Sequence, residues 1–285
     1  MCRRLARSGL RRVRWVAMEA PSDRPLFPPD SVTWRVNQEP ALLLAGGRAL
    51  LMQLAHPGVA AGVDEHSDYR RRPLRRLART LRLTMAISFG TREQALAAAR
   101  RINDTHRRVR GEGYEAMDPR LLLWVHATLI DSAVVAYRTF VGPLTLAEEE
   151  AYYRQAMVIG TLLGIPRGRY PSGLDGFRRY LADMMGGDEL RVDERARALA
   201  DRVLHPRLRL VPGLAYWPVE VLTAGLLPER LRREYGLPWG GRERLAFEAL
   251  RRTLPAMVAA LPPRLRRLPP ARRGARTWTR ALQEG

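Results

Sequence analysis

The sequence predicts an all-α protein that folds as a single multi-helix domain. Three observations support this fold class: apolar residues recur at helical spacing over long segments, helix-start signals precede several of these segments, and alternating β-branched runs bounded by turns are scarce. With 285 residues, of which 46% are hydrophobic, the chain can bury a large core. We find no internal repeat and no linker that would force a division into two domains.

The first helical pattern begins after an irregular arm. Residues 1–35 mix basic residues, prolines and two isolated tryptophans, so we assign them to an N-terminal arm and place the domain at 36–262. From Glu39 and Pro40 onward, leucines form a helical stripe that ends at Pro57 and Gly58.

The next three helices carry explicit start signals. Thr91 and Gln94 have the spacing of a capping box, which predicts a helix over about 92–110, closed by Gly111. Asp118 followed by a proline predicts the start of a helix that runs to about 140. Thr145 and Glu148 repeat the capping box for a helix that ends near Gly164.

The remaining helices are expected at about 174–185, 193–204, 217–235 and 242–260. The tail over 263–285 is rich in proline and arginine, and we expect it to be loosely packed.

Charge and cysteine content say little about partners. The formal net charge is +20, but the chain has no lysine, so the arginine content reflects a coding bias more than an acidic partner such as nucleic acid or an anionic membrane. No nucleic-acid-binding signature appears, and Cys2 alone forms no disulfide framework. The most apolar window, 121–137, contains His126 and Asp131, and no signal peptide is evident. We therefore expect a soluble cytoplasmic protein, with a weak membrane contact through the arm left open.

Two histidines lie on predicted helices. His106 lies on an apolar helical face, where an imidazole is either an axial haem ligand or a hydrogen-bonded core residue, and spacing alone favours the core residue. His126 lies in the middle of the most apolar helix, so it should be neutral. Spacing slightly favours a core role here too, with a bond to a backbone carbonyl or to Asp131.

A second group of candidate ligands lies further upstream. Imidazole and carboxylate groups suit iron, manganese or zinc, but their spacing here matches no strong zinc signature. We expect His66 to lie in a connecting loop. The candidates for such a non-haem site are His56, Asp64, Glu65, His66 and Asp68.

An arginine series follows. It is most simply a solvated basic face, yet guanidinium groups also pair with carboxylates, including haem propionates, and polarise bound oxygen species. Arg76 and Thr80 share one side of a helix, next to the side that carries Arg79. The absence of a Cys-x-x-Cys-His motif means that any haem must be held noncovalently. The series comprises Arg70, Arg71, Arg72, Arg75, Arg76, Arg79 and Arg82.

Over residues 30–235 the sequence resembles a known family, the MpaB-type oxygenases, which share their catalytic domain with the latex-clearing rubber oxygenases. The resemblance is close to the MpaB branch and remote to the rubber oxygenases. It rests on an ordered series of motifs: Leu51 to Pro57, His66-Ser67, Arg75 to Thr80 with Phe89-Gly90, His106 to Gly111, Tyr114 to Pro119, Leu123 to Leu129, and Glu149 to Gly164.

The resemblance implies an α-helical fold that encloses one noncovalent haem b. It also implies an enzyme that uses dioxygen to oxygenate a hydrophobic, often isoprenoid, substrate or to cleave one of its C=C bonds. The proximal iron ligand of the rubber oxygenases matches His106. Their distal Arg-x-x-Lys-Thr series matches Arg76 to Thr80, but Arg79 replaces the lysine. Because arginine stays protonated, it cannot readily donate a lone pair to iron. A base assigned in that family has its nearest counterpart in Glu65 or Asp64.

We therefore expect a haem-b oxygenase in which His106 binds the iron and Arg76, Arg79 and Thr80 line the opposite face. Glu65 or His66 would manage a proton. Two further histidines, His126 and His56, would support the haem pocket, and the helices over 121–137 and 152–164 would form the substrate cavity. His205 we treat as structural.

Three alternatives remain at this stage. The first is a haem enzyme that uses peroxide. The second is a haem carrier or sensor with His56 or His66 as a second axial ligand. The third is a haem-free helical module that binds acidic partners.

Overall fold

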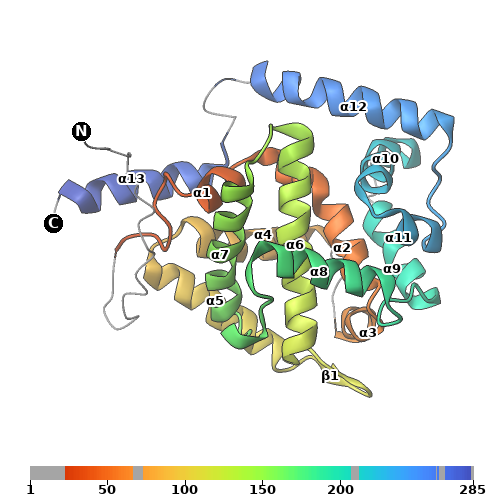
Figure 1. The fold of residues 1–285 in the computed structure, drawn as a ribbon, viewed down its shortest axis with the longest axis horizontal. Helices are drawn as coiled ribbons and strands as arrows, with labels where there is room; N and C mark the ends of the chain where they lie inside the picture. Colours follow the sequence, from red (N-terminus) through yellow and green to blue (C-terminus); the bar gives the residue numbers. More distant parts are fainter. Residues whose placement is uncertain (1–22, 67–72, 207–211, 261, 263–266, 284–285) are drawn as a thin grey trace, which may run out of the picture.

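The structure, a computed structural model, describes residues 23–66, 73–206, 212–260, 262 and 267–283. Within these residues the fold is all-α, as predicted, and the only regular strands are two short ones (Figure 1). The helices are α1 (Val32–Asn37), α2 (Gly46–Leu54), α3 (Pro57–His66), α4 (Pro73–Phe89), α5 (Arg92–His106), α6 (Pro119–Phe140), α7 (Leu146–Leu162), α8 (Gly173–Gly186), α9 (Glu194–Leu204), α10 (Trp217–Leu226), α11 (Glu229–Glu234), α12 (Gly241–Ala260) and α13 (Pro269–Gln283). The strands are β1 (Arg110–Gly111) and β2 (Tyr114–Glu115), which pair antiparallel.

Helix α6 is the centre of the fold, and other helices surround it (Figure 1). Its side chains enter three apolar clusters: Trp124 packs among residues of α2, α8 and α9, Leu123 packs with α7, and Phe140 packs with α10. Asp118 caps its first turn by accepting from the Arg120 amide. By length and apolarity α6 could cross a membrane, but 61% of its most apolar window is buried inside the protein.

Helices α4 and α5 form an antiparallel hairpin, and α13 packs against α4. The capping box at Thr91 is present as predicted, with reciprocal bonds between the Thr91 and Gln94 side chains and backbone amides. A Cβ at Gly274 would lie 2.2 Å from the Phe89 carbonyl oxygen, so glycine permits the close approach of α13.

Several predicted boundaries are wrong. Pro228 divides the predicted 217–235 helix into α10 and α11. Residues 57–66, expected to include a loop at His66, form α3. Helix α5 ends at His106 and not near 110, because Arg110 and Gly111 pair with β2 across a turn in which Gly113 has φ +75°. The tail expected to be loose contains α13, whose Ala271 is buried.

Candidate functional site

The α4–α5 hairpin brings the predicted distal and proximal residues to the same end. Ten residues separate Arg79 from the end of α4, a rise of about 15 Å, whereas His106 lies about 21 Å along α5 from Arg92. Arg76 lies about 20 Å from the end of α4, where the chain turns into α5. Arg76 is therefore level with His106, and Arg79 lies about one helical turn closer to the connection.

His106 is the last residue of α5 and is half-buried, with its Nδ1 atom shielded from solvent. One turn earlier, Asn103 donates from its side-chain amide to the Leu162 carbonyl at 3.0 Å, which fixes this end of α5 against α7. The chain then turns, since the Val109 amide donates to the His106 carbonyl at 2.9 Å. The imidazole is thus held on a defined backbone at the end of the hairpin.

The facing part of α4 presents exposed side chains. Arg79 and Thr80 are exposed, and Leu77 keeps 49% of its surface accessible although it is a large apolar residue. The side chain of Arg76 lies outside the described part of the structure, as do residues 70–72 of the arginine series. Helix α4 therefore offers both cationic and uncovered apolar surface near the end that carries His106.

Glu65 and His66 lie at the end of α3, beside the β1–β2 hairpin that follows His106. The Tyr114 hydroxyl donates to Glu65 Oε2 at 2.5 Å, and burial together with this carboxylate raises the pKa of Tyr114 to about 12. His66 Nε2 lies 3.1 Å from the Arg110 carbonyl oxygen. The structure therefore places both predicted proton-handling residues against the segment that follows His106, since their partners Arg110 and Tyr114 lie four and eight residues after it.

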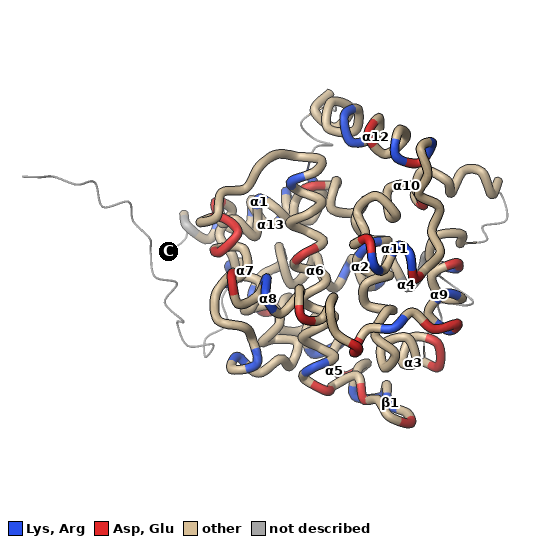
Figure 2. Tube along the Cα trace, turned by 45° about the vertical axis from the view of Figure 1, so that its right-hand side comes forward, with Lys and Arg blue, Asp and Glu red and all other residues tan. Residues whose placement is uncertain are grey.

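Ion pairs connect this end of α3 to α9. Arg195 contacts Glu65 Oε1 at 3.3 Å and Asp64 at 4.0 Å, and Arg202 lies 3.9 Å from Asp64. Figure 2 shows acidic positions on α3 and basic positions on α9 at the same side of the molecule. Because these groups are partly exposed, the pairs orient the carboxylates more than they stabilise the fold.

His126 is buried in α6, and the Tyr170 hydroxyl lies 2.8 Å from its Nδ1 atom. Desolvation lowers the pKa of His126 to about 4, so the ring is neutral, as expected. Its partner is neither a backbone carbonyl nor Asp131, which instead pairs with Arg48. Gly160 of α7 makes room for this bond, because a Cβ there would lie 1.6 Å from the Tyr170 hydroxyl.

His56 lies between α2 and α3, at the opposite end of α3 from His66. Its Nδ1 atom accepts from the Gly58 amide at 3.2 Å, and burial lowers its pKa. Within the described ranges, no group of three or more metal-ligating side chains is placed to hold an ion. Asp68 of the predicted non-haem set lies outside those ranges.

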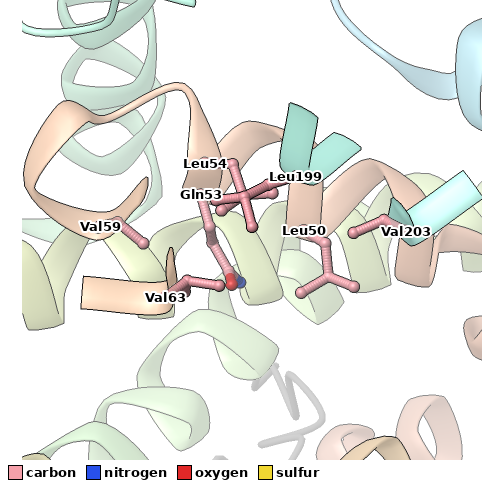
Figure 3. Close-up of a pocket in the computed structure, with 7 residues that line it drawn as sticks. All are labelled: Leu50, Gln53, Leu54, Val59, Val63, Leu199 and Val203. Carbon is pink, nitrogen blue, oxygen red and sulfur yellow. The ribbon is translucent and has the colours of Figure 1, made fainter. Parts of the chain in front are cut away.

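A cavity lies between α2, α3 and α9 (Figure 3). Its volume is about 30 Å³, and six of its seven lining residues are leucine or valine. The seventh is Gln53, the polar residue in the run Leu50-Leu51-Met52-Gln53-Leu54 and part of the motif Leu51 to Pro57. By contrast, Leu122 and Leu123 of the predicted cavity helix pack against α7 in the core.

The residues present fit a haem in chemical type. An imidazole at a helix end, with Nδ1 shielded, can offer its other nitrogen to iron. The exposed Leu77 suits contact with a porphyrin face, and the α4 arginines suit its carboxylates.

Comparison with known proteins identifies the family of the chain. A family model described as "ER-bound oxygenase mpaB/B'/Rubber oxygenase, catalytic domain" matches residues 33–256. The uncharacterized proteins Mb2261 of Mycobacterium bovis and Rv2237 of Mycobacterium tuberculosis are each 30% identical over 221 residues, which is 70% of this chain and 82% of the relative. No solved structure matches the chain. The chain therefore belongs to the family of the ER-bound oxygenases mpaB/B' and the rubber oxygenases, and contains their oxygenase catalytic domain.

Proposed function

We propose that this oxygenase depends on a noncovalent haem b and that it uses dioxygen to oxygenate a hydrophobic small molecule or cleave its C=C bond. The observation that carries the proposal is the position of His106, half-buried at the end of α5 and level with Arg76 of α4. His106 would hold the iron, and the haem, when bound, supplies the one-electron and oxygen chemistry that protein side chains lack.

The chain's own residues then have separate tasks. Arg76 and Arg79 would bind the haem carboxylates or stabilise negative charge as it develops on oxygen, and Thr80 would donate a hydrogen bond there. Glu65 would accept or return a proton, since its carboxylate is already held by Tyr114 and Arg195. Cleavage of one C=C bond by one dioxygen molecule would give two carbonyl products, so all atoms are accounted for without another reductant.

His126 and His56 would support the pocket without touching iron. Both rings have a lowered pKa because they are buried, and both use Nδ1 in a hydrogen bond, to Tyr170 and from the Gly58 amide respectively. A neutral, oriented ring adds no charge to a site that must bind an apolar substrate.

The experiment is an absorption spectrum of the protein purified from cells supplied with haem precursor. In the wild type we expect a Soret band whose intensity corresponds to about one haem per chain. The band should be lost in His106→Ala and retained in His205→Ala. His205 is a matched control because it also ends a helix but pairs with Asp201. A colourless wild type that takes up no added hemin would refute the proposal.

Turnover separates an oxygenase from a haem carrier or sensor. Oxygen uptake on addition of an unsaturated isoprenoid, with carbonyl products, supports the enzyme. A stable spectrum of two strong axial ligands, lost in His56→Ala or His66→Ala and without oxygen uptake, would indicate a carrier. Turnover with peroxide but not with dioxygen would instead indicate a peroxide-using enzyme.

A further inference from the structure

One turn before His106, the side chain of Asn103 has one terminal atom in use and one without a partner. Its amide nitrogen must be the atom that faces Leu162, because a backbone carbonyl can only accept a hydrogen bond. Nδ2 donates to that carbonyl at 3.0 Å, and this bond fixes the side chain against α7. The other terminal atom, Oδ1, is shielded from solvent, and no donor among the described residues reaches it.

A shielded acceptor without a donor is unfavourable. Buried polar atoms are nearly always hydrogen-bonded, because burial removes the bonds that they would make with water. The surroundings of Asn103 are apolar, since Ile102 of α5 packs in one cluster with Leu162 and Leu163 at the end of α7. An acceptor held in such a place indicates a donor that approaches it in another state of the protein.

His106 is the donor that the geometry of α5 favours. Residues three apart lie on one face of a helix, with Cβ atoms about 5–6 Å apart. Because helical side chains lean toward the N-terminus, the imidazole at the end of α5 extends over the turn that contains Asn103. Its Nδ1 atom is shielded from solvent, so a proton on that nitrogen needs an acceptor within the protein.

We propose that Asn103 is a positioning residue for the iron ligand: its Oδ1 atom accepts from the Nδ1–H group of His106 and so leaves Nε2 for iron. The inference rests on the proposed function, because it requires that His106 bind the haem iron. A histidine that binds a metal through one ring nitrogen almost always donates from the other to a fixed acceptor, which orients the ring and raises its basicity. The bond to Leu162 supplies that fixation, since it ties the acceptor to a second helix.

Two variants at position 103 separate this role from the anchoring of α5. Asn103→Asp and Asn103→Leu both lose the donor to Leu162, but only the aspartate keeps an acceptor. A carboxylate also accepts more strongly than an amide does. If Asn103 acted only as an anchor, the two variants would change the protein in the same direction. Thr105→Ala, at an exposed position beside His106, is the control.

The reduction potential of the full chain loaded with hemin is the first measurement. A stronger hydrogen bond to the imidazole makes it a stronger ligand and favours ferric iron. The potential should therefore fall in Asn103→Asp and rise in Asn103→Leu, each by about 59 mV, which corresponds to about a tenfold change in the preference for ferric haem. Thr105→Ala should match the wild type.

The stretching frequency of the iron–histidine bond, measured by resonance Raman spectroscopy of the ferrous protein, is the second measurement. It should rise in Asn103→Asp and fall in Asn103→Leu. Circular dichroism shows whether each variant folds, and if one does not, the sign of the shift in the other decides.

Equal potentials in the wild type and both variants would overturn the inference, and so would shifts of both variants in the same direction. With either result, a Soret band that is lost in His106→Ala would still support the proposed function. A wild type that takes up no hemin would refute both proposals.

Discussion

Replacing Gly160 by alanine tests the packing around His126. Gly160 lies in the last turn of α7, and in an ordinary helix Gly→Ala stabilises by about 0.5–1 kcal/mol. Here the added Cβ would lie 1.6 Å from the Tyr170 hydroxyl and 2.8 Å from His126 Nδ1, both far inside van der Waals contact. Gly160→Ala should therefore destabilise the protein.

The magnitude follows from two contributions. Displacing Tyr170 leaves a buried ring nitrogen without its partner, which costs about 1–3 kcal/mol. Overpacking a dense core costs about 1–3 kcal/mol more. After the helix-propensity gain is subtracted, Gly160→Ala should lower the free energy of unfolding by about 2–5 kcal/mol.

Urea unfolding followed by circular dichroism measures this change, and a double-mutant cycle identifies its cause. Tyr170→Phe removes the oxygen that the new Cβ would meet, so Gly160→Ala should cost clearly less in that background. Gly46→Ala is the matched helical control, because a Cβ at Gly46 meets nothing within 4 Å. An unchanged free energy of unfolding in Gly160→Ala would refute the reasoning, and so would an equal loss in the wild-type and Tyr170→Phe backgrounds.

Two further predictions concern buried polar groups. Burial lowers the pKa of His126 from 6.5 to about 4. Between these two pH values the ring is protonated in the unfolded chain but neutral in the folded chain. The free energy of unfolding is therefore unaffected by this group above pH 6.5 and decreases as the pH falls from 6.5 to 4. Wild type should lose about 3 kcal/mol more than His126→Asn across this window, measured by denaturant unfolding, and parallel profiles would contradict the assignment. Arg48 is 4% exposed and donates hydrogen bonds to Asp131, Ser132 and the Leu226 carbonyl. Arg48→Met should therefore lower the free energy of unfolding by about 3–5 kcal/mol. The control is Arg107→Met, which breaks an exposed ion pair with Asp104 and should lower it by less than about 1 kcal/mol. Similar losses in the two variants would show that the burial of Arg48 is not the cause.

Helix starts were predictable from sequence because their causes are local. Thr91, Asp118 and Thr145 satisfy amides within three residues of themselves, so the pattern in the sequence is the interaction itself. Helix ends were less predictable. The end of α5 at His106 depends on the pairing of β1 with β2, which lie further along the chain. The predicted stop signal, Gly111, lies five residues beyond the observed end.

The surroundings of the site depend on contacts between distant segments, which sequence spacing does not encode. His126 was expected to be neutral, and it is, because it lies on the buried face of the apolar helix α6. Its partner Tyr170 lies 44 positions away, and the space for their bond comes from Gly160 on another helix. In the same way Gln53 acquires its orientation only from Thr128, 75 residues later.

The early end of α5 has a consequence for the whole site. Because the chain leaves the helix at His106, β1 and β2 return past the end of α3, where His66 contacts the Arg110 carbonyl and Glu65 accepts from Tyr114. The carboxylate expected to manage protons is therefore tied to the segment that follows the expected iron ligand, and Arg195 ties it to α9, which also lines the cavity. A helix that continued to Gly111 would carry Arg110 about 6 Å further along the α5 axis and leave Glu65 without Tyr114. The short β-hairpin, whose Tyr114 packs in a small apolar cluster with Ala61 and Leu121, thus ties the segment that follows His106 to the end of α3 that carries Glu65.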